Sequence, residues 1–128
     1  MGDRQGEANS LGGLGSAYLF LGQFHRAIEF HQQSLEISRE IGDRQGEANS
    51  LNGFGNAYYS VGEYQRAIEF YQQSLEISRE IGDRDGEAAS LCNLGVTYEC
   101  LGQFYRAIEL GASRFCAFEH QTDIDPLR

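Results

Sequence analysis

Apolar residues recur at intervals of three and four along most of this 128-residue chain. Such spacing places the apolar side chains on one face of an α-helix. Two consecutive segments in the middle of the sequence follow it, with apolar residues at Leu51, Phe54, Tyr58 and Val61 and then at Tyr64, Ala67, Ile68, Tyr71 and Leu75. The pattern therefore predicts two successive helices, each of roughly 17–19 residues.

Glycine and aspartate mark where these helices are expected to end and begin. Gly62 and Gly82 follow the last apolar residue of each segment, where a left-handed residue commonly ends a helix. Asp43 and Asp83 come next to such a glycine and can cap the following helix. No proline precedes Pro126, so nothing interrupts the segments from within. Connections this short make consecutive helices antiparallel neighbours.

The same pattern returns with a period of 40 residues. Residues 2–41 and 42–81 differ at ten positions, and a third copy, 82–121, keeps the pattern to about Leu110 and then loses it in its second helix. Residues 122–128 are expected to form a flexible C-terminal tail. A fixed period of this length indicates stacked supersecondary units that share one core. The predicted fold is all-α, with about three repeats of antiparallel helix pairs.

The residues that the copies share resemble the tetratricopeptide repeat family. The second copy has a small residue at Gly55, an aromatic at Tyr58 and an alanine at Ala67. The equivalent residues are Gly15, Tyr18 and Ala27 in the first copy and Gly95, Tyr98 and Ala107 in the third. The long period is similar to that of LGN/Pins-type scaffolds, kinesin-light-chain relatives and bacterial repeat proteins. The resemblance implies a right-handed superhelical solenoid. We expect two helices to approach closely at Gly55, with Ala67 facing it.

Positions that vary between the copies share one face of the first helix in each copy, because they are spaced by four and three residues. In tetratricopeptide repeat proteins this face lines a concave groove that binds peptides. The resemblance therefore implies a peptide-binding groove lined by Asn9, Ser16, Leu19, Asn49, Asn52, Asn56, Tyr59 and Asn93. A polar stripe of this kind is also typical of a solvated face, and that alternative stays open.

Charge narrows the classes of partner. The formal net charge is −9, and none of the basic residues, all of them arginine, lies among the expected groove positions. An acidic surface repels phosphate backbones and anionic membranes, so neither nucleic acid nor a membrane is expected as a partner. Asparagine offers two donors and an acceptor, which suits the backbone of an extended peptide. We expect a protein or peptide partner with a neutral or basic extended segment.

No catalytic or metal centre emerges from the sequence. His25, His31 and His120 are scattered, and His31 corresponds to Tyr71 of the second copy, which predicts a packed imidazole. No cysteine or histidine pair has the spacing of a zinc site. A Cys116–His120 pair would lack an orienting third group. We therefore expect no enzyme activity, no metal and no cofactor.

Cysteine usage and hydropathy complete the expectations. Cys92 and Cys100 are eight residues apart, about 12 Å along one helix, so free thiols are expected rather than a disulfide between them. No apolar run approaches the ~18 residues of a spanning helix, and no signal pattern opens the chain, so a cytoplasmic location is expected.

A second function is compatible with the same repeats. Near-identical units can pair across chains as they do within one, so the chain is also interpretable as a self-assembling unit that forms a homo-oligomer through its repeat ends. Phe115, Cys116 and Phe118 would then belong to the contact. A further alternative is a fragment of a larger tetratricopeptide repeat scaffold without its own ligand.

Overall fold

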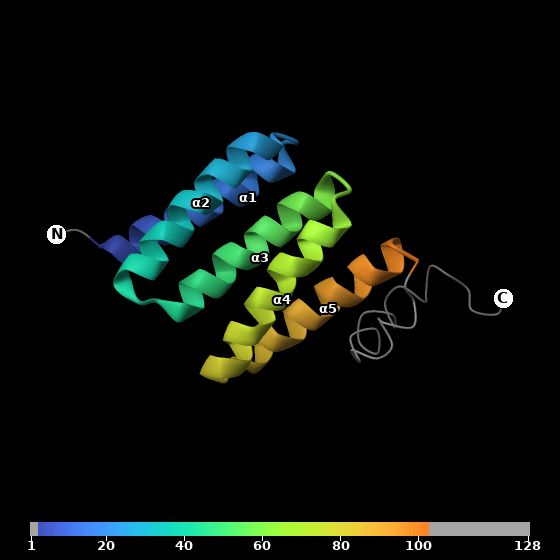
Figure 1. The fold of residues 1–128 in the computed structure, drawn as a ribbon. Coiled ribbons are helices and arrows are strands. Elements are labelled where there is room, and N and C mark those ends of the chain that lie inside the picture. Colours follow the sequence, from blue (N-terminus) through green and yellow to red (C-terminus); the bar gives the residue numbers. More distant parts are fainter. Residues whose placement is uncertain (1–2, 103–128) are drawn as a thin grey trace.

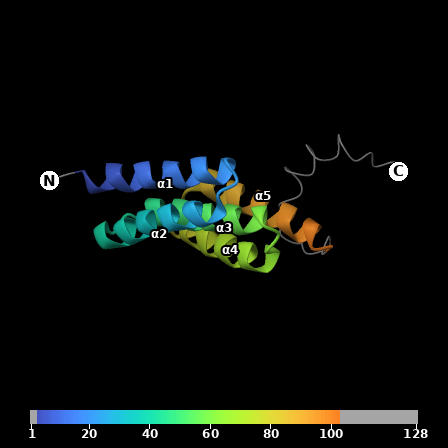
Figure 2. The same ribbon diagram turned by 90° about the horizontal axis from the view of Figure 1, so that it is seen from above.

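A computed structural model describes residues 3–102. In this part of the chain the helices are α1 (Arg4–Phe20), α2 (Phe24–Ile41), α3 (Arg44–Ser60), α4 (Tyr64–Ile81) and α5 (Arg84–Cys100). Consecutive helices run antiparallel and pack side by side in chain order (Figure 1). Seen from above, α1 lies on the opposite side of the stack from α2 and α4 (Figure 2). The prediction of an all-α helical repeat fold is confirmed.

The helix boundaries follow the expected capping chemistry. The side chain of Asp43 accepts a hydrogen bond from the Gly46 amide at 3.0 Å, and Asp83 does the same with Gly86. Gly82 ends α4 in the left-handed conformation with φ 74°. Positive φ angles also occur at the other predicted ends and turns, namely Gly22, Gly42, Gly62 and Gly102. Because only glycine adopts this conformation without strain, the glycine positions fix the repeat length.

Two clusters of buried side chains hold the stack together. One joins α2, α3 and α4 through Leu35, Ala48, Leu51, Phe54 and Ile77. The other joins α4 and α5 through Ala67, Ile68, Tyr71, Leu75, Leu94 and Tyr98. Burying one large apolar side chain contributes about 1.5–3 kcal/mol, so these junctions provide most of the cohesion between repeats.

In the first two helix pairs a glycine of the first helix makes room for an aromatic ring of the second. A Cβ on Gly55 would lie 2.5 Å from Cε1 of Tyr71, and a Cβ on Gly15 would lie 2.8 Å from Nε2 of His31. The close approach expected at Gly55 is therefore correct, and the atoms nearest to such a Cβ belong to the ring of Tyr71. The ring of Tyr71 fills the space that a small facing residue would leave open.

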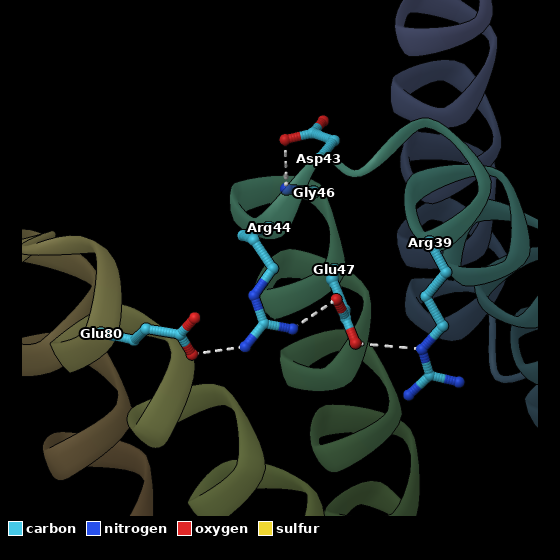
Figure 3. Close-up of polar contacts among 6 residues, drawn as sticks. All are labelled: Arg39, Asp43, Arg44, Gly46, Glu47 and Glu80. Atoms are coloured by element: carbon cyan, nitrogen blue, oxygen red, sulfur yellow. Dashed lines mark hydrogen bonds and ion pairs between the residues drawn. The ribbon is translucent and has the colours of Figure 1, made fainter.

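Ion pairs join the ends of neighbouring helices outside this core. Glu47 lies between two arginines, at 2.8 Å from Arg44 and 3.0 Å from Arg39, and Arg44 also contacts Glu80 (Figure 3). Arg79 and Glu87 repeat the Arg39–Glu47 pair one copy later, at 2.9 Å. These arginines are mostly exposed, so each pair contributes well under ~1 kcal/mol. The ion pairs nevertheless show which carboxylates these arginines contact.

Several sequence expectations concern the C-terminal part of the chain. The second helix of the third copy, with Ala107, lies outside the described residues, as do residues 122–128 and the expected end contact at Phe115, Cys116 and Phe118. The unit boundaries 2–41, 42–81 and 82–121 stay predictions. Cys100 is a free thiol, as expected, and it is exposed. Cys92 is disulfide-bonded, so the expectation of a free thiol is wrong there.

No helix within residues 3–102 is long and apolar enough to cross a membrane.

Candidate functional site

A cavity of about 340 Å³ lies between α1, α2 and α3. Asn9 and Ser16 line it from α1, and Asn49, Asn52 and Asn56 line it from α3. The structure thus brings together five of the eight residues expected in a groove. The remaining lining residues are Ala8, Gly12, Gly13, His31, Ser34, Ser38, Gly46, Ser50 and Gly53. No charged side chain occurs among these described lining residues.

The other three expected groove residues are not among those that line the cavity. The Tyr59 hydroxyl is 3.3 Å from Sγ of Cys100 and its ring packs against Tyr64, so Tyr59 connects α3 with α4 and α5. Leu19 is half-buried near the end of α1. Asn93 on α5 donates through Nδ2 to Oδ1 of Asn52 at 3.2 Å. Tyr59 therefore contacts the next repeat, and Asn93 contacts the preceding one.

The asparagines on α3 all have their carbonyl oxygens engaged inside the protein. The Tyr71 hydroxyl donates to Oδ1 of Asn56 at 2.6 Å, and Nε2 of Gln45 donates to Oδ1 of Asn49 at 3.3 Å. Oδ1 of Asn52 accepts from Asn93 as described above. Each contact orients an amide, because the oxygen faces its donor and the NH₂ group is left for another partner. The α3 wall thus offers a row of hydrogen-bond donors.

His31 lies at the floor of the cavity. It is 3% exposed, and neither Nδ1 nor Nε2 has a hydrogen-bond partner among the described residues. Its ring lies between Gly15 and Gly53, at both of which a Cβ would overlap the imidazole. Burial lowers the pKa of His31 below its ordinary value of 6.5 and keeps the ring neutral. The predicted packed imidazole is confirmed.

Serines on α2 complete the floor. Ser34 donates to the Ala8 carbonyl at 2.8 Å and accepts from Ser50 at 3.2 Å. Ser38 is 1% exposed, and its Oγ has no partner within the described residues. Sequence reasoning missed these serines because Ser34, Ser38 and Ser50 recur as Ser74, Ser78 and Ser90. A comparison of the copies that keeps only the variable positions assigns the invariant residues to stacking. The signal that would have identified these serines is a polar residue at a position expected to be buried.

The junction between the second and third copies has the same serine contacts but different walls. Ser74 donates to the Ala48 carbonyl at 3.0 Å, as Ser34 does to Ala8. Cys92 and Val96 stand where α3 has Asn52 and Asn56, and Asn93 stands where α3 has Gly53. The polar asparagine wall is therefore specific to the junction of the first two copies.

The described arginines do not line the cavity, and most of them make contacts elsewhere. Arg26 lies over the Tyr18 ring at 4.9 Å from its centroid, and Arg66 lies over Tyr58 at 4.7 Å. Arg39 and Arg44 are held in the ion pairs at the helix ends (Figure 3), and Arg79 forms an equivalent pair with Glu87. The cavity thus has no cation that would neutralise an anionic ligand.

Known proteins of similar sequence and structure agree with this architecture. The family model described as tetratricopeptide repeat matches residues 6–80 and again 46–113. A comparison with curated protein sequences finds no match. Among solved structures, the TPR domain of Arabidopsis FLU superposes with a TM-score of 0.80 at 20% identity, over 92% of this chain and 99% of that one.

Two further structures match this chain over part of their own length. Aspartyl phosphate phosphatase F from Bacillus subtilis has a TM-score of 0.82 at 18% identity, covering 95% of this chain and 32% of that one. The nearly identical TPR-like repeats of a putative kinesin light chain from Podospora anserina give 0.72 at 23% identity, covering 89% and 58%. At these identities the likeness shows the fold alone.

The match to the family model extends over most of the sequence, and the helix pairs have the geometry of that family. Tetratricopeptide repeats form a general protein–protein interaction module, and proteins built from them are typically non-catalytic scaffolds. The chain belongs to the tetratricopeptide repeat family.

Proposed function

We propose that the cavity between α1, α2 and α3 is part of a groove that binds an extended, uncharged segment of a partner protein. The observation that carries the proposal is the row of amide donors at Asn49, Asn52 and Asn56, whose oxygens are engaged inside the protein. A row of donors suits a row of carbonyl acceptors, and an extended backbone presents such a row along each edge.

Spacing along α3 supports a backbone as the ligand. Residues 49, 52 and 56 are separated by three and four positions, which is about 4.5 and 6 Å of rise along a helix. Carbonyls on one edge of an extended chain recur about every 6.6–6.8 Å. Neighbouring asparagines can therefore serve successive carbonyls of one edge, or share one carbonyl between them.

Charge selects against an acidic ligand. A carboxylate drawn into the cavity would lose hydration without gaining a cation, since the described lining residues carry none. The net charge of −9 adds a long-range repulsion. Neutral segments, or neutral segments with basic flanks, are accordingly favoured.

Peptide binding tests the proposal. Pools of acidic, neutral and basic twelve-residue peptides are titrated against the wild-type chain, a variant with both Asn52→Ala and Asn56→Ala, and the control Gln73→Ala, which removes an exposed carboxamide on α4. Two lost hydrogen bonds of about 1 kcal/mol each predict roughly 30-fold weaker binding of neutral peptides by the double variant. Unchanged binding by that variant, or tightest binding of the acidic pool, would refute the proposal.

A second candidate, self-association, has its own supporting observation on α1. Leu14 is 43% exposed, whereas the equivalent residues Phe54 and Leu94 are 4% and 0% exposed, because α3 and α5 each pack on a preceding repeat. Ser10 and Ala17 are likewise exposed, with buried counterparts in α3 and α5. The outer face of α1 therefore has the chemistry of a repeat junction.

Sedimentation over a range of protein concentrations tests this candidate. Association through the α1 face predicts a concentration-dependent mass that Leu14→Glu abolishes. Phe20→Glu is the control, because Phe20 is 92% exposed and its counterparts Ser60 and Cys100 are exposed too. A monomer at every concentration would exclude self-association while leaving the groove untouched.

A further inference from the structure

Two differences between the copies set the cavity apart from the rest of the stack. In the second copy the hydroxyl of Tyr71 reaches Asn56 and closes the space between α3 and α4 with a hydrogen bond of 2.6 Å. In the first copy His31 replaces this tyrosine and Ser16 replaces the asparagine. A histidine is shorter than a tyrosine and a serine shorter than an asparagine. The equivalent bond is therefore not made, and both residues line the cavity instead.

Unsatisfied polar atoms are concentrated in the same place. Among the described residues, the buried side-chain nitrogen and oxygen atoms without a hydrogen-bond partner are Nδ1 and Nε2 of His31 and Oγ of Ser38. Both residues are more than nine-tenths buried, and both line the cavity. Buried polar groups are normally paired, because an unpaired one costs free energy. A ligand that pairs with them recovers that free energy on binding.

The wall and the floor of the cavity require different hydrogen-bonding groups from a ligand. Asn52 and Asn56 on the α3 wall have NH₂ groups left to donate, so they require an acceptor. A neutral imidazole carries one donor and one acceptor nitrogen, so His31 also requires a donor. No charged group lines the cavity within the described residues, so a charged ligand group would be desolvated without compensation.

A primary carboxamide carries both functions on separate atoms and has no charge. Its oxygen can accept from the wall while its NH₂ group donates to the floor. A hydroxyl has only one oxygen for both duties, and an apolar group leaves every polar atom unpaired. The cavity volume of about 340 Å³ is at the lower end of the range for small-molecule pockets, which is ample for one side chain.

We infer that the cavity floored by His31 is a specificity site that accepts the side chain of an asparagine or glutamine from the bound partner segment. The inference rests on the proposed peptide groove and adds the residue type that the groove selects. Asn52 and Asn56 hold the carboxamide oxygen, and His31 receives its NH₂ group.

Variants of the histidines separate this role from general stability. His31→Phe removes both ring nitrogens but keeps an aromatic ring, and His31→Tyr places in the first copy the residue that the second copy already packs at Tyr71. His25→Tyr is the matched control, because His25 is exposed on the same helix and does not line the cavity. The circular dichroism of each full-length variant reports whether it folds.

A positional-scanning library of twelve-residue peptides is bound to the wild-type chain and to these three variants. The expected result is a position at which the wild type prefers Asn or Gln over Asp, Lys and Leu by about tenfold, the effect of one or two hydrogen bonds. Both His31 variants lose this preference while still binding peptide, and His25→Tyr keeps it.

Different failures have different meanings in this experiment. Peptide binding that depends on Asn52 and Asn56 but shows no carboxamide preference overturns the inference and leaves the groove standing. The same holds if the preference survives in His31→Phe and His31→Tyr. Absence of any peptide binding by the wild type overturns the proposed function, and the inference with it.

Discussion

Replacing Gly55 by alanine tests the close packing that defines each helix pair. A Cβ at this position would lie 2.5 Å from Cε1 of Tyr71, well inside van der Waals contact. The ring has no easy way to move, because Tyr71 is buried and its hydroxyl is bonded to Asn56 at 2.6 Å. The substitution must therefore strain the pair or break that hydrogen bond.

The expected magnitude combines opposing effects. Alanine in a helix interior is about 1 kcal/mol more favourable than glycine. Overpacking costs about 1–3 kcal/mol, and loss of the Tyr71–Asn56 bond costs about 1 kcal/mol more. The net expectation for Gly55→Ala is a loss of about 1–3 kcal/mol in the free energy of unfolding. For a domain of this size, a loss of about 2 kcal/mol lowers the Tm by roughly 7 °C.

Urea denaturation followed by circular dichroism measures the effect, and the chain contains its own control. Gly13 also lies in a helix interior, but a Cβ there would meet nothing within 4 Å. Gly13→Ala should therefore gain up to about 1 kcal/mol. In a Tyr71→Leu background the cost of Gly55→Ala should largely disappear. If Gly55→Ala is stabilised as much as Gly13→Ala, the close packing of Tyr71 on Gly55 is wrong.

Three other predictions concern pH, capping and local stability. Burial lowers the pKa of His31 in the folded chain below the value of about 6.5 that it has in the unfolded chain. The neutral ring therefore contributes stability above pH 6.5, and this contribution is lost as the pH falls below about 6.5 through the lowered folded pKa. Urea titrations between pH 7.5 and 5 should show wild type losing more stability than His31→Phe, whereas equal losses would contradict a buried neutral imidazole. Asp43→Ala should cost about 1 kcal/mol by removing the cap on Gly46, and Gln45→Ala, an exposed change in the same turn, should cost much less. Hydrogen exchange should be faster in α1, where only Ala8 and Gly15 are buried, than in α3, which buries seven residues; slower exchange in residues 11–21 than in 51–61 would contradict this.

Much of the fold could be predicted from the sequence because its determinants are local and repeated. Asp43 and Gly82 set helix ends through the backbone conformation of single residues, and both were identified from their place in the period. Apolar spacing fixed the buried faces in the same way. The contact of the Tyr71 ring with Gly55 was not predicted, because it depends on how two helices cross, which a one-dimensional pattern does not contain.

The candidate site was predictable only in part. Asn9, Ser16 and the three asparagines of α3 were found because they vary between copies on one helix face. Tyr59 and Asn93 satisfy the same criterion, yet Tyr59 bridges to the following repeat through Cys100 and Asn93 bridges to the preceding one through Asn52. Position on a helix face tells which way a side chain points but not whether a neighbour from the next repeat takes it as a partner.

The ten differences between the first two copies show how a near-duplicate repeat acquires a site of its own. The residues that stack one helix pair on the next, such as Ala8 and Ala48 or Leu35 and Leu75, are identical. Changes at the equivalents of Asn52, Asn56 and Tyr71 alter the cavity wall and floor while leaving those stacking residues in place. The unpaired nitrogens of His31 are then the feature to explain, since the second copy demonstrates that a tyrosine packs at the same position and satisfies its own hydroxyl. A polar residue kept in a less satisfied state than its own duplicate is best understood as one whose partner arrives with the ligand.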